Sequence, residues 1–181
     1  MISFASQEAA PSFDDPLEML HACHGKILRQ CDTLRKLAPH LASNGCDQQA
    51  QQAAQGILRY FDTAGKFHHQ DEEEDVFPAL RAADPDKSQL ESLLGRLLQE
   101  HIGMLAAWDA LRPTLLQLSQ GIQVPLAPAQ TEDFIGRYTR HIAFEESELL
   151  PLAAKLLDAR QQMNIGKHMA ERRGAKFSPG D

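Results

Sequence analysis

Residues 67–78 read FHHQDEEEDVFP, which places two histidines ahead of five consecutive acids in a segment that otherwise predicts a helix. His68 and Glu72 are four residues apart, so on a helix their side chains share one face about one turn apart. One such pair is weak evidence, because helices contain many by chance. We expect the other acids at 71, 74 and 75 to form a solvated face, and Glu73 to be a surface group or to lie just outside a site.

The same pattern returns near the end of the chain, where residues 140–151 read RHIAFEESELLP. His141 and Glu145 repeat the spacing of four, and a second Glu follows at once in both copies. A proline stands ten residues after the histidine in each copy. Two copies in matched frames are an internal repeat, which indicates a shared role. We expect Glu146, like Glu73, to be a surface group or to lie just outside a site.

Composition favours one all-α domain. The chain has 181 residues, with 43% hydrophobic but only 6% aromatic residues, which favours a core of Leu and Ala in helices over a β-sandwich. Charge and cysteine content limit the partners and the location that we expect. A net charge of −7 argues against a nucleic-acid binder. Three cysteines without a Cys-x2-Cys pair, no leader-like N-terminus and no long apolar run predict a cytoplasmic protein with no membrane contact.

Apolar residues spaced by three and four predict four helices, at about residues 16–42, 47–83, 87–118 and 130–160. Short turns join the first three, and a longer loop with two prolines precedes the fourth. We expect an up-down-up-down four-helix bundle at 16–160. Residues 1–15 are expected to be a flexible arm. Residues 161–181 are expected to be a basic tail, loosely docked or disordered, and a candidate contact for a protein partner or a second copy.

Each predicted helix carries one histidine on its buried seam, and two helices add a glutamate one turn on. The six residues are His24, His68, Glu72, His101, His141 and Glu145. Counting about 1.5 Å per residue from the turns places the histidines at similar heights in the bundle. Burying an ionised group without a partner costs on the order of several kcal/mol for each ion. The six residues therefore need a common solution that satisfies all of them.

A metal centre is such a solution. Four imidazoles and two carboxylates suit iron, with manganese or zinc as lesser options. Six donors are too many for one tetrahedral zinc. Two metals that share Glu72 and Glu145 as bridges would use all six donors, with histidines at both sides. Both metals would then be under-coordinated, which leaves room for a small ligand such as O2.

The order and spacing of these six residues resemble the hemerythrin-like, or HHE cation-binding, domain over roughly residues 16–160. The resemblance implies that the six residues hold a carboxylate-bridged pair of non-haem irons, with an oxo or hydroxo bridge as an option. Members of this family bind O2 reversibly, sense O2 or redox state, handle iron, or repair nitrosative damage to iron–sulfur clusters.

The third predicted helix departs from the oxygen-carrying hemerythrins, which have two histidines there, one turn apart. Leu97 and Leu105 stand one turn either side of His101. A fifth histidine would have to come from elsewhere, with His69 as the first candidate and His21 and His40 after it. This departure weakens the case for oxygen carriage more than the case for metal binding.

We therefore expect a binder or sensor of O2 or a related diatomic, without catalytic residues. Iron storage or delivery, repair of iron centres, and reduction of peroxide or nitric oxide stay open as alternatives. A ferritin-like bundle requires Glu-x-x-His on two helices, and Glu18 with His21 is the only such pair in the sequence. The competing class is a metal-free helical interaction module, which gives no reason for the repeat.

Overall fold

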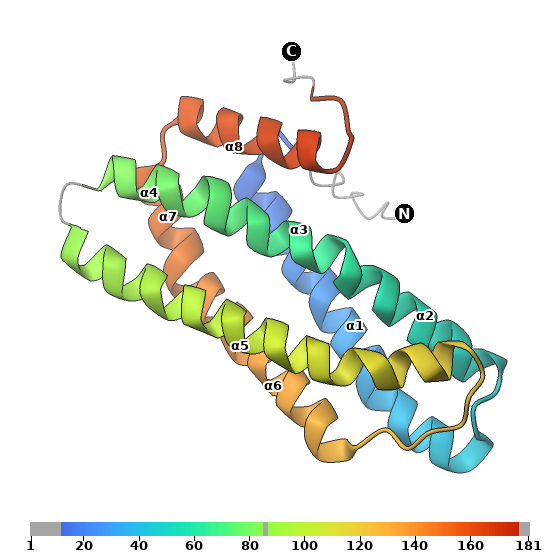
Figure 1. Cartoon of the computed structure of the whole chain (residues 1–181). Helices are drawn as coiled ribbons and strands as arrows, with labels where there is room; N and C mark the ends of the chain where they lie inside the picture. The colour runs from blue at the N-terminus through green and yellow to red at the C-terminus, as the bar shows by residue number, and fades with distance from the viewer. Residues whose placement is uncertain (1–11, 85–86, 178–181) are drawn as a thin grey trace, which may run out of the picture.

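The computed structural model describes residues 12–84 and 87–177, and every regular element in these ranges is helical (Figure 1). The all-α prediction is therefore confirmed for the described part of the chain. Residues 1–11 of the expected N-terminal arm lie outside these ranges. No helix within them is long and apolar enough to span a bilayer.

In the described residues, four long helical segments, which we call rods, make up most of the fold, and a shorter helix near the C-terminus packs against the first and second rods (Figure 1). α1 packs against α2 and α6, and α5 packs against the same two helices. The elements are α1 (Pro16–Asn44), then α2 (Gln48–Asp62), α3 (Ala64–Gln70), η1 (Asp71–Val76) and α4 (Phe77–Ala83) in the second rod, α5 (Lys87–Ser119), then α6 (Pro128–Phe144), η2 (Glu145–Leu149) and α7 (Leu150–Leu156) in the fourth rod, and finally α8 (Ala159–Arg172).

The helix starts follow from local side-chain chemistry. Asp15 accepts a hydrogen bond from the Glu18 amide ahead of a helix that begins at Pro16, as the sequence predicts. Asp158 forms a reciprocal cap with Gln161 at the start of α8. Pro39 lies inside α1, and the helix continues beyond it to Asn44.

Two apolar clusters fill the interior, one towards each end of the rods. Residues such as Phe61, Leu111 and Phe134 belong to one cluster, and residues such as Leu94 and Leu149 to the other. Each predicted histidine stands between members of the two clusters along its own rod, as His24 stands between Leu20 and Ile27 on α1. The predicted histidines and glutamates therefore form one polar layer between the two apolar clusters.

The structure around α8 contradicts two expectations from the sequence: that the C-terminal tail is loosely docked or disordered, and that Asp71 lies on a solvated face. The basic residues of the expected tail bind their own chain, since Arg172 and Arg173 both contact the Asp71 carboxylate, the latter at 2.6 Å. Arg172 also lies 2.9 Å from Asp75. Asp71 is 0% exposed rather than solvated, because α8 covers η1 and supplies the compensating cations. A partner contact through the tail, and the domain boundaries, stay predictions.

The double variant Arg172→Met/Arg173→Met tests this contact. It leaves the buried Asp71 carboxylate without a cation, so we expect the free energy of unfolding to fall by about 3 kcal/mol. Urea denaturation of the metal-free protein measures the change. Lys167→Met on the same helix is the control. Lys167 is exposed, and its ion pair with the exposed Glu171 is long, at 3.8 Å, so the free energy of unfolding of this variant should hardly change. Equal stability of the two variants would contradict a stabilising role for the arginines.

Candidate metal centre

All six predicted residues meet in one buried layer, and each is at most 4% exposed. Their donor atoms form two groups of four, and within each group they lie within 4.8 Å of one another. One group contains His24 and His68, and the other contains His101 and His141. Glu72 and Glu145 belong to both groups. The layer that the sequence predicts is therefore present as a spatial arrangement.

Each carboxylate directs one oxygen to each pair of histidines. The Glu145 oxygens lie 3.0 Å from His24 Nε2 and 3.0 Å from His141 Nε2. The Glu72 oxygens lie 3.2 Å from His68 Nε2 and 3.3 Å from His101 Nε2. Although these pairs are close, none of the four oxygens has a hydrogen-bond partner among the described residues.

Unpaired buried oxygens at these separations fit metal ions. Two donors that each lie about 2.1 Å from one ion are roughly 3.0–3.4 Å apart at right-angled to tetrahedral geometry, which is the separation that these atoms have. The Nε2 atoms of His24 and His68 also lack hydrogen-bond partners in the described chain. The residues present therefore fit two cations bridged by two carboxylates.

The two glutamates sit at the start of π-helical turns. The Phe77 amide donates to the Glu72 carbonyl, and the Leu150 amide donates to the Glu145 carbonyl, each five residues back. A proline follows directly, at 78 and at 151. Proline has no N–H and its ring clashes with the carbonyl four residues before it, and a wider turn relieves this clash. The proline of the repeat therefore marks a π-helical turn, which is frequent at functional sites.

Carboxylates outside the layer orient three of the four imidazoles. The Nδ1 atoms of His24 and His101 lie 2.5 Å and 2.6 Å from Glu146 and Glu73. His141 Nδ1 lies 2.8 Å from Glu100. These contacts turn the Nε2 atoms inward, as outer carboxylates do around metal-bound histidines. The sequence reasoning missed Glu100, although an acid directly beside a candidate ligand, as at 73 and 146, was an available signal.

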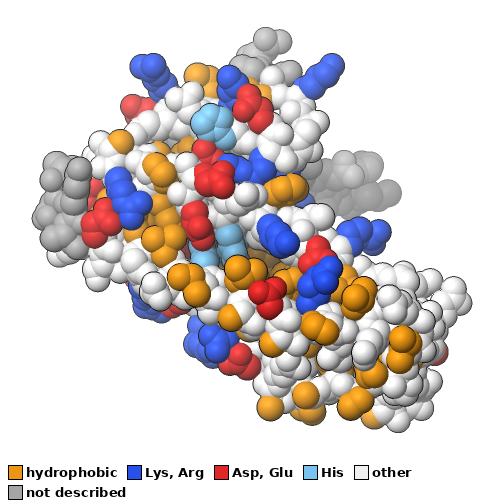
Figure 2. Space-filling view, viewed as in Figure 1, with side chains coloured by type: hydrophobic (Ala, Val, Ile, Leu, Met, Phe, Trp, Pro, Cys, Tyr) orange, Lys and Arg blue, Asp and Glu red, His pale blue; other side chains and the backbone are white. Residues whose placement is uncertain are grey.

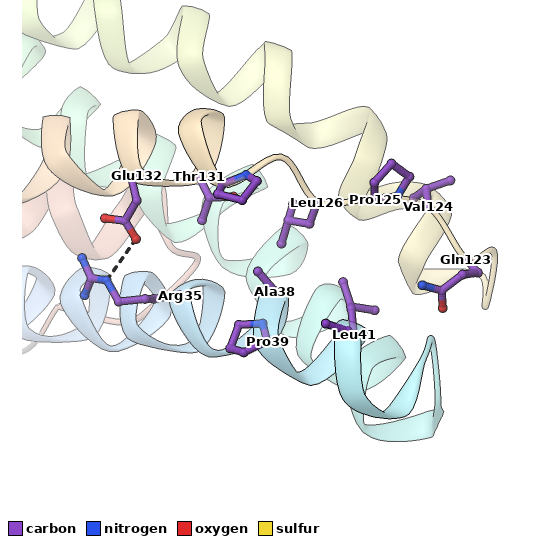
Figure 3. Close-up of a pocket in the computed structure, with 12 residues that line it drawn as sticks. Arg35, Ala38, Pro39, Leu41, Gln123, Val124, Pro125, Leu126, Thr131 and Glu132 are labelled. Carbon is purple, nitrogen blue, oxygen red and sulfur yellow. Dashed lines mark hydrogen bonds and ion pairs between the residues drawn. The ribbon is translucent and has the colours of Figure 1, made fainter.

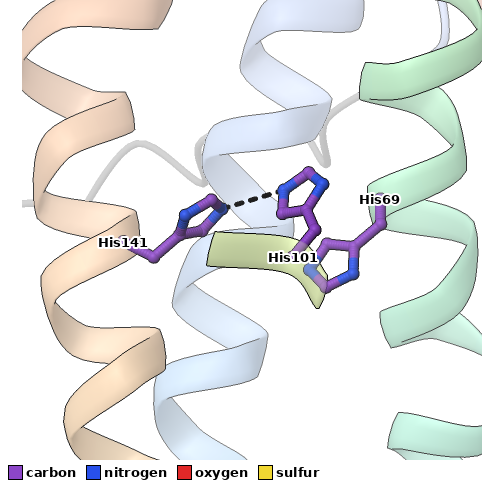
Figure 4. A group of neighbouring side chains, drawn as sticks. All are labelled: His69, His101 and His141. Carbon is purple, nitrogen blue, oxygen red and sulfur yellow. Dashed lines mark hydrogen bonds between the residues drawn. The ribbon is translucent and has the colours of Figure 1, made fainter. Parts of the chain in front are cut away.

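Of the three candidates for a fifth histidine, His69 alone lies beside the second group. Its ring stacks on that of His101 with centroids 4.0 Å apart, and Figure 4 shows it next to His101 and His141. The Nε2 atoms of His101 and His141 are 3.1 Å apart. His21 is exposed and contacts Glu146 at 2.9 Å, and His40 contacts Asp47 at 2.9 Å.

In the metal-free layer, burial and neighbouring charges shift the pKa values of the glutamates and histidines. Burial, together with the nearby Glu145 charge, raises the pKa of Glu72 well above its ordinary value. Burial also acts to raise the pKa of Glu145, but the contacts with His141 and His24 outweigh it and hold that pKa well below its ordinary value. Burial lowers the pKa of both histidines, and the Glu145 carboxylate more than restores it. A metal would therefore replace protons on these groups.

A groove of about 610 Å³ lies away from this layer (Figure 3). It lies between the end of α1 and the segment that leads into α6, with apolar walls such as Pro39, Leu41 and Leu126. Arg35 and Glu132 form an ion pair of 3.3 Å at its edge. None of its lining residues is a candidate metal ligand.

Comparison with known proteins agrees with this layer. The sequence model of the hemerythrin HHE cation binding domain matches residues 15–153, a range that contains all six residues but not α8. An uncharacterized protein of Haemophilus influenzae is 35% identical over 165 residues, which cover 91% of this chain and 94% of the relative. The chain thus belongs to the hemerythrin HHE cation binding domain family.

Proposed function

We propose that the protein holds two iron ions in this layer and binds or senses O2 or a related diatomic. The observation that carries the proposal is the pair of four-donor groups that share both buried carboxylates. His24 and His68 would hold one ion, His101 and His141 the other, and Glu72 and Glu145 would bridge them. A mixed nitrogen and oxygen donor set of this kind suits iron. Bound ferrous iron would supply electrons and open coordination positions to a small ligand.

The proposal includes an up-down-up-down arrangement of the four rods, which is supported by the packing of α1 and α5 against both α2 and α6. It also includes a cytoplasmic location. The three cysteines are free thiols, and Cys23 and Cys31 are buried, which suits a reducing compartment.

Three measurements on the iron-loaded protein separate the proposed function from the alternatives: O2 titration, iron release, and turnover of peroxide or nitric oxide. A visible spectrum that forms with O2 and disappears on its removal supports binding or sensing. Loss of iron to a weak chelator or an acceptor protein indicates iron delivery instead. Turnover of peroxide or nitric oxide above the rate for free iron indicates an enzyme.

Iron content of purified protein tests the layer itself. We expect about two irons per chain in the wild type, and fewer than one in Glu72→Ala and in His141→Ala. The exposed Glu148 and the distant His40 supply matched controls, and Glu148→Ala and His40→Ala should retain iron. Metal-free Glu72→Ala should fold at least as well as wild type, because it removes a buried carboxylate. Iron-free wild type would contradict the proposal.

Iron affinity should rise with pH. The Glu72 pKa is raised by burial, and the pKa values of His24 and His141 are raised on balance by Glu145, so these groups keep their protons to higher pH than they would in water. Binding releases these protons, and affinity should therefore increase by up to about tenfold per pH unit for each proton displaced. Anaerobic Fe²⁺ titrations at several values between pH 6 and 8, in competition with a chelator, measure this slope. An affinity that is independent of pH would contradict it.

Glu100→Gln tests the outer carboxylates. The variant removes the charge beside His141 Nδ1, and we expect metal affinity to fall by about 10- to 100-fold. Arg96→Met is the matched control, because it removes the 2.8 Å partner of Glu100 on the solvent side and leaves the contact with His141. An unchanged affinity in Glu100→Gln would show that this carboxylate does not support the centre.

A further inference from the structure

A groove of about 520 Å³ between α3 and α5 reaches the metal layer from the surface. Both His69 and His101 line it. Ile102 and Leu105 also line it, and they are exposed by 61% and 52% although they are large apolar side chains. Figure 2 shows histidine surface in a hollow of this face, among acidic and apolar side chains. The groove therefore offers a route with an apolar wall towards the second group of donors.

A much smaller cavity, of about 30 Å³, adjoins this groove. The two spaces share Lys66, His69 and Leu105 as lining residues. The remaining walls of the cavity are aromatic or small: Phe61, Gly65, Trp108 and Tyr138. Its volume suits one molecule of the size of water or O2. Apolar walls favour a neutral diatomic over water, because water loses its hydrogen bonds there.

His69 stands where the two spaces and the metal layer meet. Its Nε2 atom is buried and has no hydrogen-bond partner among the described residues, an arrangement that is costly unless something occupies the position. His69, His101 and His141 each present a donor atom within 4.8 Å of the others. A small ligand beside the second pair of histidines would therefore lie within reach of this unpaired nitrogen.

We propose that a diatomic such as O2 enters between α3 and α5, passes Leu105 into the small cavity, and is hydrogen-bonded by His69 next to the metal position of His101 and His141. The part that concerns the metal rests on the proposed function. The entry route does not, because it depends only on the groove and the cavity.

The entry route can be measured on metal-free protein. Trp108 is the single tryptophan of the chain and lines the small cavity, so quenching of its fluorescence by dissolved O2 reports access. Leu105→Phe should narrow the junction and lower the quenching constant at least about twofold relative to wild type. Leu116→Phe is the matched control on the same helix, at a leucine that is 41% exposed, and should not change it. Equal quenching in all three proteins would overturn the route.

The role of His69 is measured on iron-loaded ferric protein with azide, a small anion that can accept a hydrogen bond. His69→Leu should retain both irons and weaken azide binding at least about tenfold, the effect of losing one hydrogen bond to a charged group. His69→Gln keeps an N–H donor and should weaken it less. Unchanged azide affinity in both variants would overturn the role.

Loss of one iron in His69→Leu would also overturn it, and would make His69 a metal ligand instead. If the wild type binds no iron, both the proposed function and the role of His69 at the metal are refuted. In that case the Trp108 measurement would still decide the entry route.

Discussion

Two carboxylates with no exposed surface stand at one height in the middle of a helical fold, and the surrounding structure is arranged around them. Burying Glu72 and Glu145 together is unfavourable, because each ion loses its hydration and the two charges repel. Four imidazoles around them relieve only part of this, since the carboxylate oxygens still lack hydrogen bonds among the described residues. A pair of cations between the histidine pairs would satisfy all of these atoms.

The layer is held from outside as well as from within. Glu73, Glu100 and Glu146 fix the orientation of three imidazoles from the far side of each ring. On the second rod, Asp71 directly precedes Glu72 and binds Arg172, the last residue of α8, and Arg173, which directly follows it. α8 thus braces the π-helical turn that presents one of the two shared carboxylates. These contacts would hold the ligands of the proposed centre in one geometry.

Sequence reasoning found the four rods and the six residues of the layer, because a repeated His-x3-Glu in matched frames constrains both face and height. It missed the π-helical turns, since one extra residue in a turn hardly alters the apolar period, although the prolines at 78 and 151 marked the places. It took α8 for a loose tail, because Arg172 and its partner Asp71 are 101 residues apart and no local pattern joins them. It missed the contact of Glu100 with His141 for a similar reason, because this contact joins two different helices. The role of the six residues as ligands stays a proposal.

The central claim is that two metal ions share both carboxylates. Crystals of iron-loaded protein, with anomalous diffraction recorded at the iron absorption edge, test this claim most directly. The account predicts two peaks about 3.5–4 Å apart, each within bonding distance of one oxygen of Glu72 and one of Glu145, with His24 and His68 at one and His101 and His141 at the other. A single peak, or iron bound away from this layer, would contradict it.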